Sequence, residues 1–282
     1  VALVDLELAG KVAVVTGGSR GIGEAIAATL VQEGVSVVIA ARRQDKLDEA
    51  CAAIGPQVRG VRCDVTKLAD LDNLAAFVCE QYGGCDILVN NAGTGTYKPF
   101  LDVTEDDLQY GMDINFFAQF RLAQRLVPMM IERGSGVIVN ISGRTAVRTA
   151  YPPGSTCTGP AKAAEVRFTA DLAEELKPLN IRVVGVIPGV VMTPDRFTKW
   201  ESEARGDSLG QDEAERLRSA VESDKLPSNA RWGTPQEIAD FVAFFASPRA
   251  SYLSGESLVV AGSPTAYSYV RALNEAPGGA PT

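Results

Sequence analysis

The sequence predicts a single α/β domain in which helices cover both faces of a doubly wound parallel sheet. Short, almost uniformly apolar runs alternate with segments of helical periodicity over most of the 282 residues. A strand that is apolar at nearly every position has both faces buried, which is typical of a parallel sheet between helices. The length is within the range of one large domain, and the sequence has no internal repeat.

Seven apolar runs are expected to form the strands of this sheet. They cover residues 11–16, 35–40, 58–62, 87–90, 136–141, 181–187 and 257–260. The segments between them place apolar side chains every three or four residues, as amphipathic helices do. The expected helices cover residues 21–33, a segment through Leu47 and Ile54, residues 68–82, 104–133 and 159–179, and a segment from Thr234 through Phe245.

Two of these helices begin with a capping box, in which a threonine and an acidic residue three positions later bond each other's backbone N–H groups. Thr104 with Asp107 begins a long helix that is expected to run to Arg133. Thr234 with Glu237 begins the last helix.

Two regions interrupt the alternating pattern. Residues 193–226 are polar and charged, with Phe197 and Trp200 near their start, and we interpret them as a lid over a site rather than as a second domain. The tail over residues 263–282 is rich in Pro, Ala and Gly and is expected to be poorly ordered. The domain is therefore expected to span residues 1–262.

Composition excludes several classes of function. The net charge of −8, with acidic and basic residues interspersed, argues against nucleic acid or an anionic membrane as the partner. The absence of histidine excludes Ser-His-Asp chemistry, a histidine base and the usual zinc sites, so no metal is expected. Five cysteines with no CxxC pair predict reduced thiols in a cytoplasmic protein. No apolar run reaches about 18 residues, and no signal-peptide pattern is present, so neither export nor membrane insertion is expected.

A glycine-rich turn lies between the first expected strand and the first expected helix. Residues 16–23 read TGGSRGIG. Glycines at this place let the chain turn tightly and bring backbone N–H groups close to a pyrophosphate at the helix N-terminus. The turn therefore predicts a dinucleotide site in a Rossmann fold.

The spacing TGxxxGIG differs from the common GxGxxG and resembles the short-chain dehydrogenase/reductase family. Four further segments are similar to motifs of that family and occur in the family's order: CDV at 63–65, NNAG at 90–93, PGVVMT at 188–193 and RWGTPQEIA at 231–239. Together the five motifs cover about residues 8–262. The resemblance implies an oxidoreductase that binds a nicotinamide dinucleotide, acts on a small-molecule substrate and forms a homo-oligomer, either a tetramer or a dimer.

The resemblance also assigns the cofactor residues. They are Gly17, Ser19, Arg20, Gly21, Ile22, Gly23, Arg42, Arg43, Asp64, Val65, Asn91, Ala92, Gly93, Lys162, Pro188, Gly189, Val191 and Thr193. An acidic ribose ligand for NAD would be expected near position 41, which is alanine and is followed by two arginines. Guanidinium groups there, with Arg20 nearby, suit a 2′-phosphate, so NADP(H) is the expected cofactor.

The catalytic residues match the family only in part. Asn115 and Lys162 stand at its asparagine and lysine positions, and the lysine is implied to hold the nicotinamide ribose and to lower the pKa of a neighbouring hydroxyl. The tyrosine position, four residues before the lysine, is Thr158, and the serine position is Gly143, with Ser142 one residue earlier. An alcohol has a pKa several units above that of a phenol, so Thr158 cannot simply replace the tyrosine as proton donor.

Three interpretations remain open. In the first, the chain reduces a carbonyl or a conjugated enoyl group with a different proton donor, for which Tyr151 is the main candidate and Cys157 and Ser155 are weaker ones. In the second, it binds NADP(H) but catalyses a non-redox reaction or none. In the third, a water molecule bound by Lys162 and Asn115 donates the proton to a carbonyl.

Overall fold

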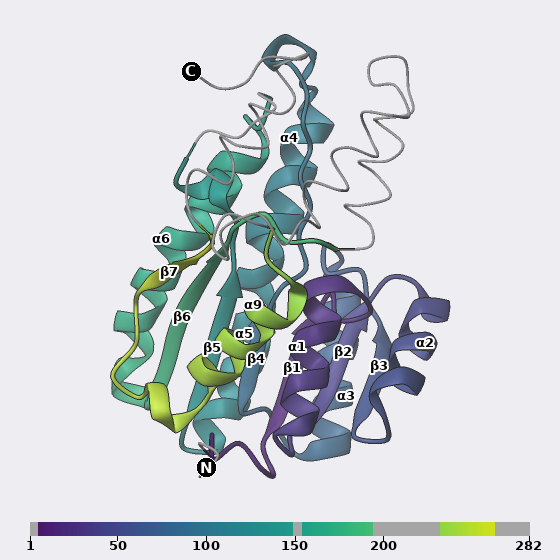
Figure 1. Ribbon diagram of the computed structural model, residues 1–282, viewed down its shortest axis with the longest axis vertical. Coiled ribbons are helices and arrows are strands. Elements are labelled where there is room, and N and C mark those ends of the chain that lie inside the picture. The colour runs from purple at the N-terminus through teal and green to yellow at the C-terminus, as the bar shows by residue number, and fades with distance from the viewer. Residues whose placement is uncertain (1–4, 149–153, 194–231, 263–282) are drawn as a thin grey trace, which may run out of the picture.

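A computed structural model describes residues 5–148, 154–193 and 232–262 of the chain. Within these ranges, seven parallel strands form one sheet in the order β3-β2-β1-β4-β5-β6-β7 (Figure 1). The strands are β1 Val12–Thr16, β2 Ser36–Ala41, β3 Val58–Arg62, β4 Ile87–Asn90, β5 Gly136–Ile141, β6 Ile181–Pro188 and β7 Ser257–Val260. The predicted doubly wound sheet is confirmed, and the strand order switches direction between β1 and β4, where ligands bind in such folds.

Helices cover both faces of the sheet, and each face has its own apolar core. The helices are α1 Gly21–Gln32, α2 Gln44–Ile54, α3 Leu68–Tyr82, α4 Glu105–Met112, α5 Ala118–Glu132, α6 Thr158–Leu176 and α9 Pro235–Ala246. Residues of α1, α2 and α9 share one core, and residues of α3, α5 and α6 share the other. Figure 1 shows α1 and α9 in front of the sheet.

Successive side chains along a strand pack alternately into the two cores. In β1, Ala13 and Val15 belong to the core of α1 and α9, and Val14 belongs to the core of α3 and α5. Because successive side chains of a strand point to opposite faces, a strand between two cores is apolar at every position. Full burial of such a side chain contributes about 1.5–3 kcal/mol.

The prediction of a single helix over residues 104–133 is wrong. Helix α4 begins with the predicted capping box at Thr104 and Asp107, but it ends at Met112. A π-helical segment, Asp113–Phe117, then separates it from α5. The side-chain amide of Asn115 in this segment donates to the carbonyl of Gly111 at 2.9 Å, a contact within the helix that accompanies the change of winding.

The helix expected over 159–179 also differs at its ends. Helix α6 begins at Thr158 and ends at Leu176, and a 3₁₀ turn, Lys177–Leu179, completes the segment. The second predicted capping box, Thr234 with Glu237, is confirmed at the start of α9.

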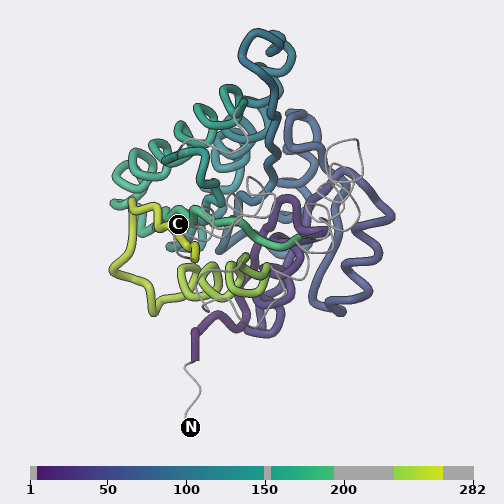
Figure 2. The backbone as a smooth tube through the Cα atoms, turned by 45° about the horizontal axis from the view of Figure 1, so that its top comes forward, coloured from purple at the N-terminus to yellow at the C-terminus, as the bar shows by residue number. Residues whose placement is uncertain are grey.

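The segment before α4 protrudes from the body of the protein. It contains the short 3₁₀ turn Phe100–Asp102, and Figure 2 shows it as a loop beyond the layers of helices. The predicted lid over 193–226 lies outside the described residues except for Thr193, and so does the tail predicted over 263–282. In the described ranges, no helix combines the length and the apolar character that crossing a membrane requires.

Candidate active site and cofactor cleft

Two cavities lie at the carboxyl ends of the central strands. The first, of about 700 Å³, adjoins the turn between β1 and α1, and we call it the glycine-turn cavity. The second, of about 630 Å³, contains Lys162, and we call it the lysine cavity. Both are lined by Ile22, Asn91, Gly93, Thr94 and Thr193, so they form one continuous cleft.

The cleft brings together most of the residues predicted from the sequence. The glycine-turn cavity is lined by Gly17, Ser19, Arg20, Gly21, Ile22, Gly23, Arg42, Arg43, Asp64, Val65, Asn91, Ala92, Gly93 and Thr193. The lysine cavity is lined by Ser142, Thr158, Lys162, Pro188, Gly189 and Val191, among others. Asn115 lines neither cavity, and Tyr151 lies outside the described residues.

The turn before α1 leaves no room for side chains at its tightest point. Gly17 has a φ of 65°, and a Cβ atom on Gly23 would lie 2.3 Å from the carbonyl oxygen of Gly17. At the N-cap of α1, Arg20 makes no side-chain capping hydrogen bond to the first turn. The first N–H groups of a helix have no partner within the helix, and together with the positive end of the helix dipole they favour an anion. These residues therefore fit the pyrophosphate of a dinucleotide.

Hydrogen bonds between Thr16, at the end of β1, and the residues just after β4 also shape this turn. The backbone N–H groups of Asn91 and Ala92 both donate to Oγ1 of Thr16, each at 3.0 Å, and Nδ2 of Asn91 donates to the Thr16 carbonyl at 2.9 Å. These bonds fix the end of β4 against the end of β1. Thr16 was not assigned a role from the sequence, although it begins the glycine-rich motif.

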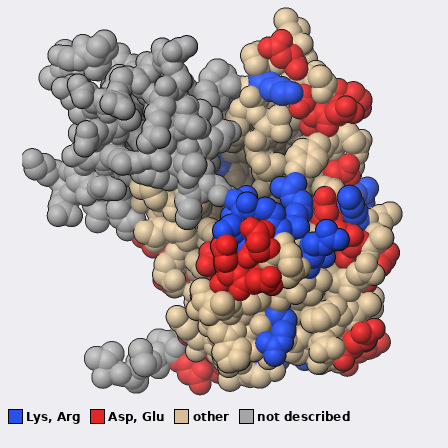
Figure 3. Space-filling model, turned by 90° about the vertical axis from the view of Figure 1, so that its right-hand side faces the viewer, with Lys and Arg blue, Asp and Glu red and all other residues tan. Residues whose placement is uncertain are grey.

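Cationic side chains border the glycine-turn cavity where β2 ends. Arg20, Arg42 and Arg43 are exposed and line the cavity. Figure 3 shows Lys and Arg side chains gathered on the side of the molecule where α2 lies, with acidic side chains directly beside them. Among the described residues that line this cavity, Asp64 is the one carboxylate, and its Oδ1 accepts from the N–H and the hydroxyl of Thr66.

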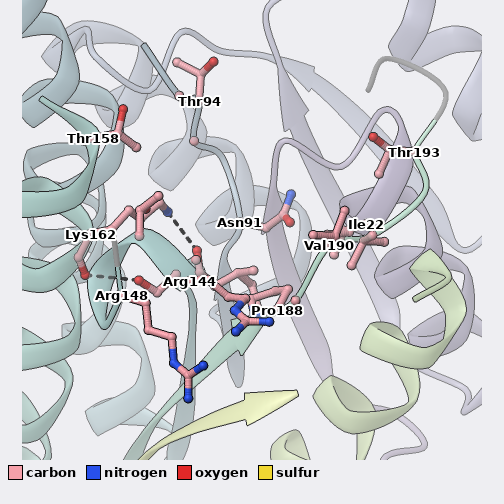
Figure 4. A pocket seen from close by; sticks show the side chains of 18 of the residues that line it. Ile22, Asn91, Thr94, Arg144, Arg148, Thr158, Lys162, Pro188, Val190 and Thr193 are labelled. Carbon is pink, nitrogen blue, oxygen red and sulfur yellow. Dashed lines mark hydrogen bonds between the residues drawn. The ribbon is translucent and has the colours of Figure 1, made fainter. Parts of the chain in front are cut away.

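Lys162 lines the lysine cavity beside Gly93, which lines both cavities. Its Nζ donates to the carbonyl of Ile141 at 2.9 Å, as Figure 4 shows, and pairs with Oε2 of Glu165 at 3.0 Å. A Cβ atom on Gly93 would be 3.1 Å from this Nζ, so only glycine lets the ammonium come so close to the chain after β4. The hydroxyl of Ser142 donates to the backbone carbonyl of Lys162 at 3.1 Å and fixes the start of α6.

Glu165 is a functional candidate that sequence reasoning missed. Its side chain is 0% exposed and lies one helical turn beyond Lys162 on α6. Burial raises the pKa of this carboxyl above its usual value, and the neighbouring Lys162 ammonium partly opposes that shift. The three-residue spacing from Lys162 within a helix was the signal that could have identified the pair.

Asn115 and Thr158 both hold the segment after β4. Asn115 accepts from the N–H of Thr94 through Oδ1 at 3.1 Å and donates to its carbonyl through Nδ2 at 2.9 Å. Oγ1 of Thr158 accepts from the N–H of Thr96 at 2.9 Å and donates to its carbonyl at 3.3 Å. These two side chains therefore fix one wall of the lysine cavity through backbone contacts.

The two weaker donor candidates do not line either cavity. Cys157 is buried at the start of α6, and burial raises the pKa of its thiol. Ser155 is half-buried and lies three residues before Thr158. Neither side chain is therefore placed to give a proton to a molecule in the cleft.

Comparison with known proteins places the chain in a family. A family profile described as short chain dehydrogenase matches residues 11–204, which is more than half of the chain. The chain belongs to the short-chain dehydrogenase family. A curated relative, dehydrogenase/reductase SDR family member 4 from Oryctolagus cuniculus, is 38% identical over 90% of this chain and 94% of its own length.

Two further relatives indicate the chemistry found in this family. The 7alpha-hydroxysteroid dehydrogenase of Escherichia coli K12 is 34% identical over 92% of this chain and 95% of its own length. The structure of L-sorbose reductase from Gluconobacter frateurii with NADPH and L-sorbose superposes with a TM-score of 0.84 at 35% identity, covering 92% of this chain and 98% of that one. A structure of 7alpha-hydroxysteroid dehydrogenase that holds NADH superposes with a TM-score of 0.77 at 33% identity, covering 92% of this chain and 95% of that one. These short-chain dehydrogenases are oxidoreductases, and they include structures with either nicotinamide cofactor.

Proposed function

We propose that this short-chain dehydrogenase is an NADP(H)-dependent reductase of a carbonyl group. The observation that carries the proposal is the continuous cleft, which joins the cationic glycine-turn cavity to Lys162. The L-sorbose reductase structure, which contains NADPH and a ketose, supports the same assignment.

Different residues of the cleft would bind different parts of the cofactor. Backbone N–H groups at the start of α1 would hold the pyrophosphate, and Arg42 and Arg43 would hold the 2′-phosphate. Lys162 would hold the nicotinamide ribose and set the ring beside the lysine cavity. When bound, the reduced cofactor supplies the hydride for the carbonyl carbon.

Proton delivery requires a donor other than a tyrosine at the position four residues before Lys162, because Thr158 occupies that position. The Thr158 hydroxyl is already bonded to both backbone groups of Thr96, and an alcohol is a far weaker acid than a phenol. We assign the role to a water molecule held by the Lys162 ammonium, which gives its proton to the carbonyl oxygen. The remaining hydroxide is stabilised by the ammonium and regains a proton from solvent.

Substitution of Lys162 tests the proposal through binding and turnover together. Lys162→Ala should weaken NADPH binding and abolish most ketone reduction, measured by fluorescence titration and by NADPH oxidation with a panel of ketones. Lys177→Ala, which removes an exposed lysine just after α6, serves as the matched control. Tight NADPH binding without oxidation by any ketone would instead favour a non-redox NADP(H)-binding protein.

Tyr151 remains the alternative donor, outside the described residues. If water is the donor, Tyr151→Phe keeps the wild-type kcat. A fall of at least tenfold, with unchanged NADPH affinity, would move the role to this tyrosine.

A further inference from the structure

Two arginines enter the lysine cavity from the segment after β5. Arg144 begins the 3₁₀ turn Arg144–Ala146, and Arg148 follows one turn later, with its backbone N–H bonded to the Arg144 carbonyl at 2.9 Å. Arg144 is half-buried, Arg148 is exposed, and both line the cavity. Figure 4 shows the Arg144 guanidinium near Pro188, with Thr94 and Thr158 farther away on the other side of the cavity.

Among the described residues, the lining of the lysine cavity differs in charge from the chain as a whole. The chain carries a net charge of −8, yet no carboxylate is found among the described residues that line this cavity. The same part of the lining includes the cationic side chains of Arg144, Arg148 and Lys162. The Lys162 ammonium also pairs with the buried carboxyl of Glu165.

The other residues that line the lysine cavity suit a small organic molecule. Tyr97, Ile141, Pro188, Val190 and Val191 add apolar and aromatic surface to the lining of the lysine cavity. A substrate in this cavity would therefore contact apolar side chains as well as cationic groups. In the proposed function, its carbonyl reacts beside Lys162.

We propose that the carbonyl substrate carries an anionic oxyacid group, a carboxylate or a phosphate monoester, which Arg144 and Arg148 bind in the lysine cavity. This assignment rests on the proposed reductase function. The planar guanidinium offers parallel N–H donors that match two oxygens of a carboxylate or a phosphate, and such charge-assisted bonds are stronger than neutral ones. The arginines bind and orient the substrate and take no part in the proton transfer.

Binding of this kind has a kinetic signature. The anionic group is not the group that reacts, so its contacts should be equally strong in the bound substrate and in the transition state. Loss of such a contact raises KM and leaves kcat nearly unchanged. A purely structural role of the segment would lower kcat/KM for charged and neutral substrates alike.

Two matched substrate pairs test the inference: levulinate with levulinamide, and hydroxyacetone phosphate with hydroxyacetone. The wild-type enzyme should prefer at least one anion over its neutral partner, and the pair with the larger ratio identifies carboxylate or phosphate. Arg148→Gln should lower kcat/KM for that anion by about ten- to a hundredfold, through KM, and should change the neutral partner less than twofold. Arg167→Gln, which removes an exposed arginine on α6 outside the cavity, should leave kcat/KM unchanged for both the anion and its neutral partner.

Binding gives a second readout that does not depend on turnover. The preferred anion should raise the melting temperature of the wild type loaded with NADP⁺, which has no hydride to transfer, and Arg148→Gln should remove most of that rise. Two results would overturn the inference while leaving the reductase assignment intact. Either the wild type shows the same kcat/KM for both members of each pair, or Arg148→Gln lowers kcat/KM equally for both members. Stabilisation by the anion with no NADPH oxidation would overturn the reductase assignment and retain the anion site.

Discussion

At the scale of single residues, Lys162, which lines the cleft, forms a buried ion pair with Glu165, which does not. Sequence patterns predicted the place of Lys162, because its spacing from Thr158 and its helical context match a family motif. They did not predict Glu165, because a carboxyl on a helix is usually solvated, and only the packing of α6 against the sheet shows that this one is buried. The same holds for Arg144 and Arg148, whose entry into a cavity depends on how the chain turns after β5.

The pH dependence of stability tests the environment of Glu165. Because burial raises the pKa of this carboxyl, the folded state holds its proton more tightly than the unfolded state does. The free energy of unfolding therefore falls as the pH rises from the usual value of 4.5 through the raised pKa. Glu165→Gln cannot ionise, so the melting temperature of this variant relative to wild type should rise with pH across that interval. A difference that is constant or that falls with pH would contradict the raised pKa.

We expect Arg42 and Arg43 to set the cofactor preference. Replacing either with alanine should weaken NADPH binding about ten- to a hundredfold, because a charge-assisted contact to the 2′-phosphate is worth about 1.5–3 kcal/mol. Binding of NADH, which lacks that phosphate, should be unchanged. Fluorescence titration of both cofactors measures the effect, with Arg167→Ala as the control. Wild-type affinities that are equal for the two cofactors would refute the NADP(H) assignment.

At the scale of elements, periodicity located most of the secondary structure. Four strands begin and end where the apolar runs predicted, and the other three differ by a single residue at one or both ends. The π-helical segment between α4 and α5 could not be predicted in this way. It contains Asn115, whose amide contacts the backbone of Gly111 one helical turn earlier and also that of Thr94. The contact with Thr94 is distant in sequence and leaves no trace in periodicity.

Asn115→Ala should destabilise this junction. The substitution leaves the N–H and carbonyl of Thr94 and the carbonyl of Gly111 without their side-chain partner. We expect the free energy of unfolding to fall by about 1–3 kcal/mol. Urea unfolding followed by circular dichroism measures the change. Gln109→Ala, on the exposed side of α4, should lower the free energy of unfolding much less. Equal decreases in the two variants would argue against this anchoring role of Asn115.

At the scale of the whole molecule, two buried cysteines report on how tightly the core shared by α3, α5 and α6 is closed. All five cysteines are free thiols; Cys79 is exposed, and Cys63 and Cys85 are buried in that core. Burial raises the pKa of the Cys63 and Cys85 thiols to about 12, so almost no reactive thiolate is present near neutral pH. A thiol reagent should therefore modify Cys79 rapidly and these two only at the rate of unfolding. Rapid modification of all three would show that this core opens far more readily than its packing indicates.

The path of hydrogen from cofactor to product tests the reductase assignment most directly. NADPH that carries deuterium at the transferring position of its nicotinamide should be incubated with the protein and with the ketones and oxyacid ketones described above. Mass spectrometry should find one deuterium on the carbinol carbon of the product, and Lys162→Ala should reduce this labelling to near background. Tight binding of NADPH with no deuterium in any product would contradict reduction at this cleft.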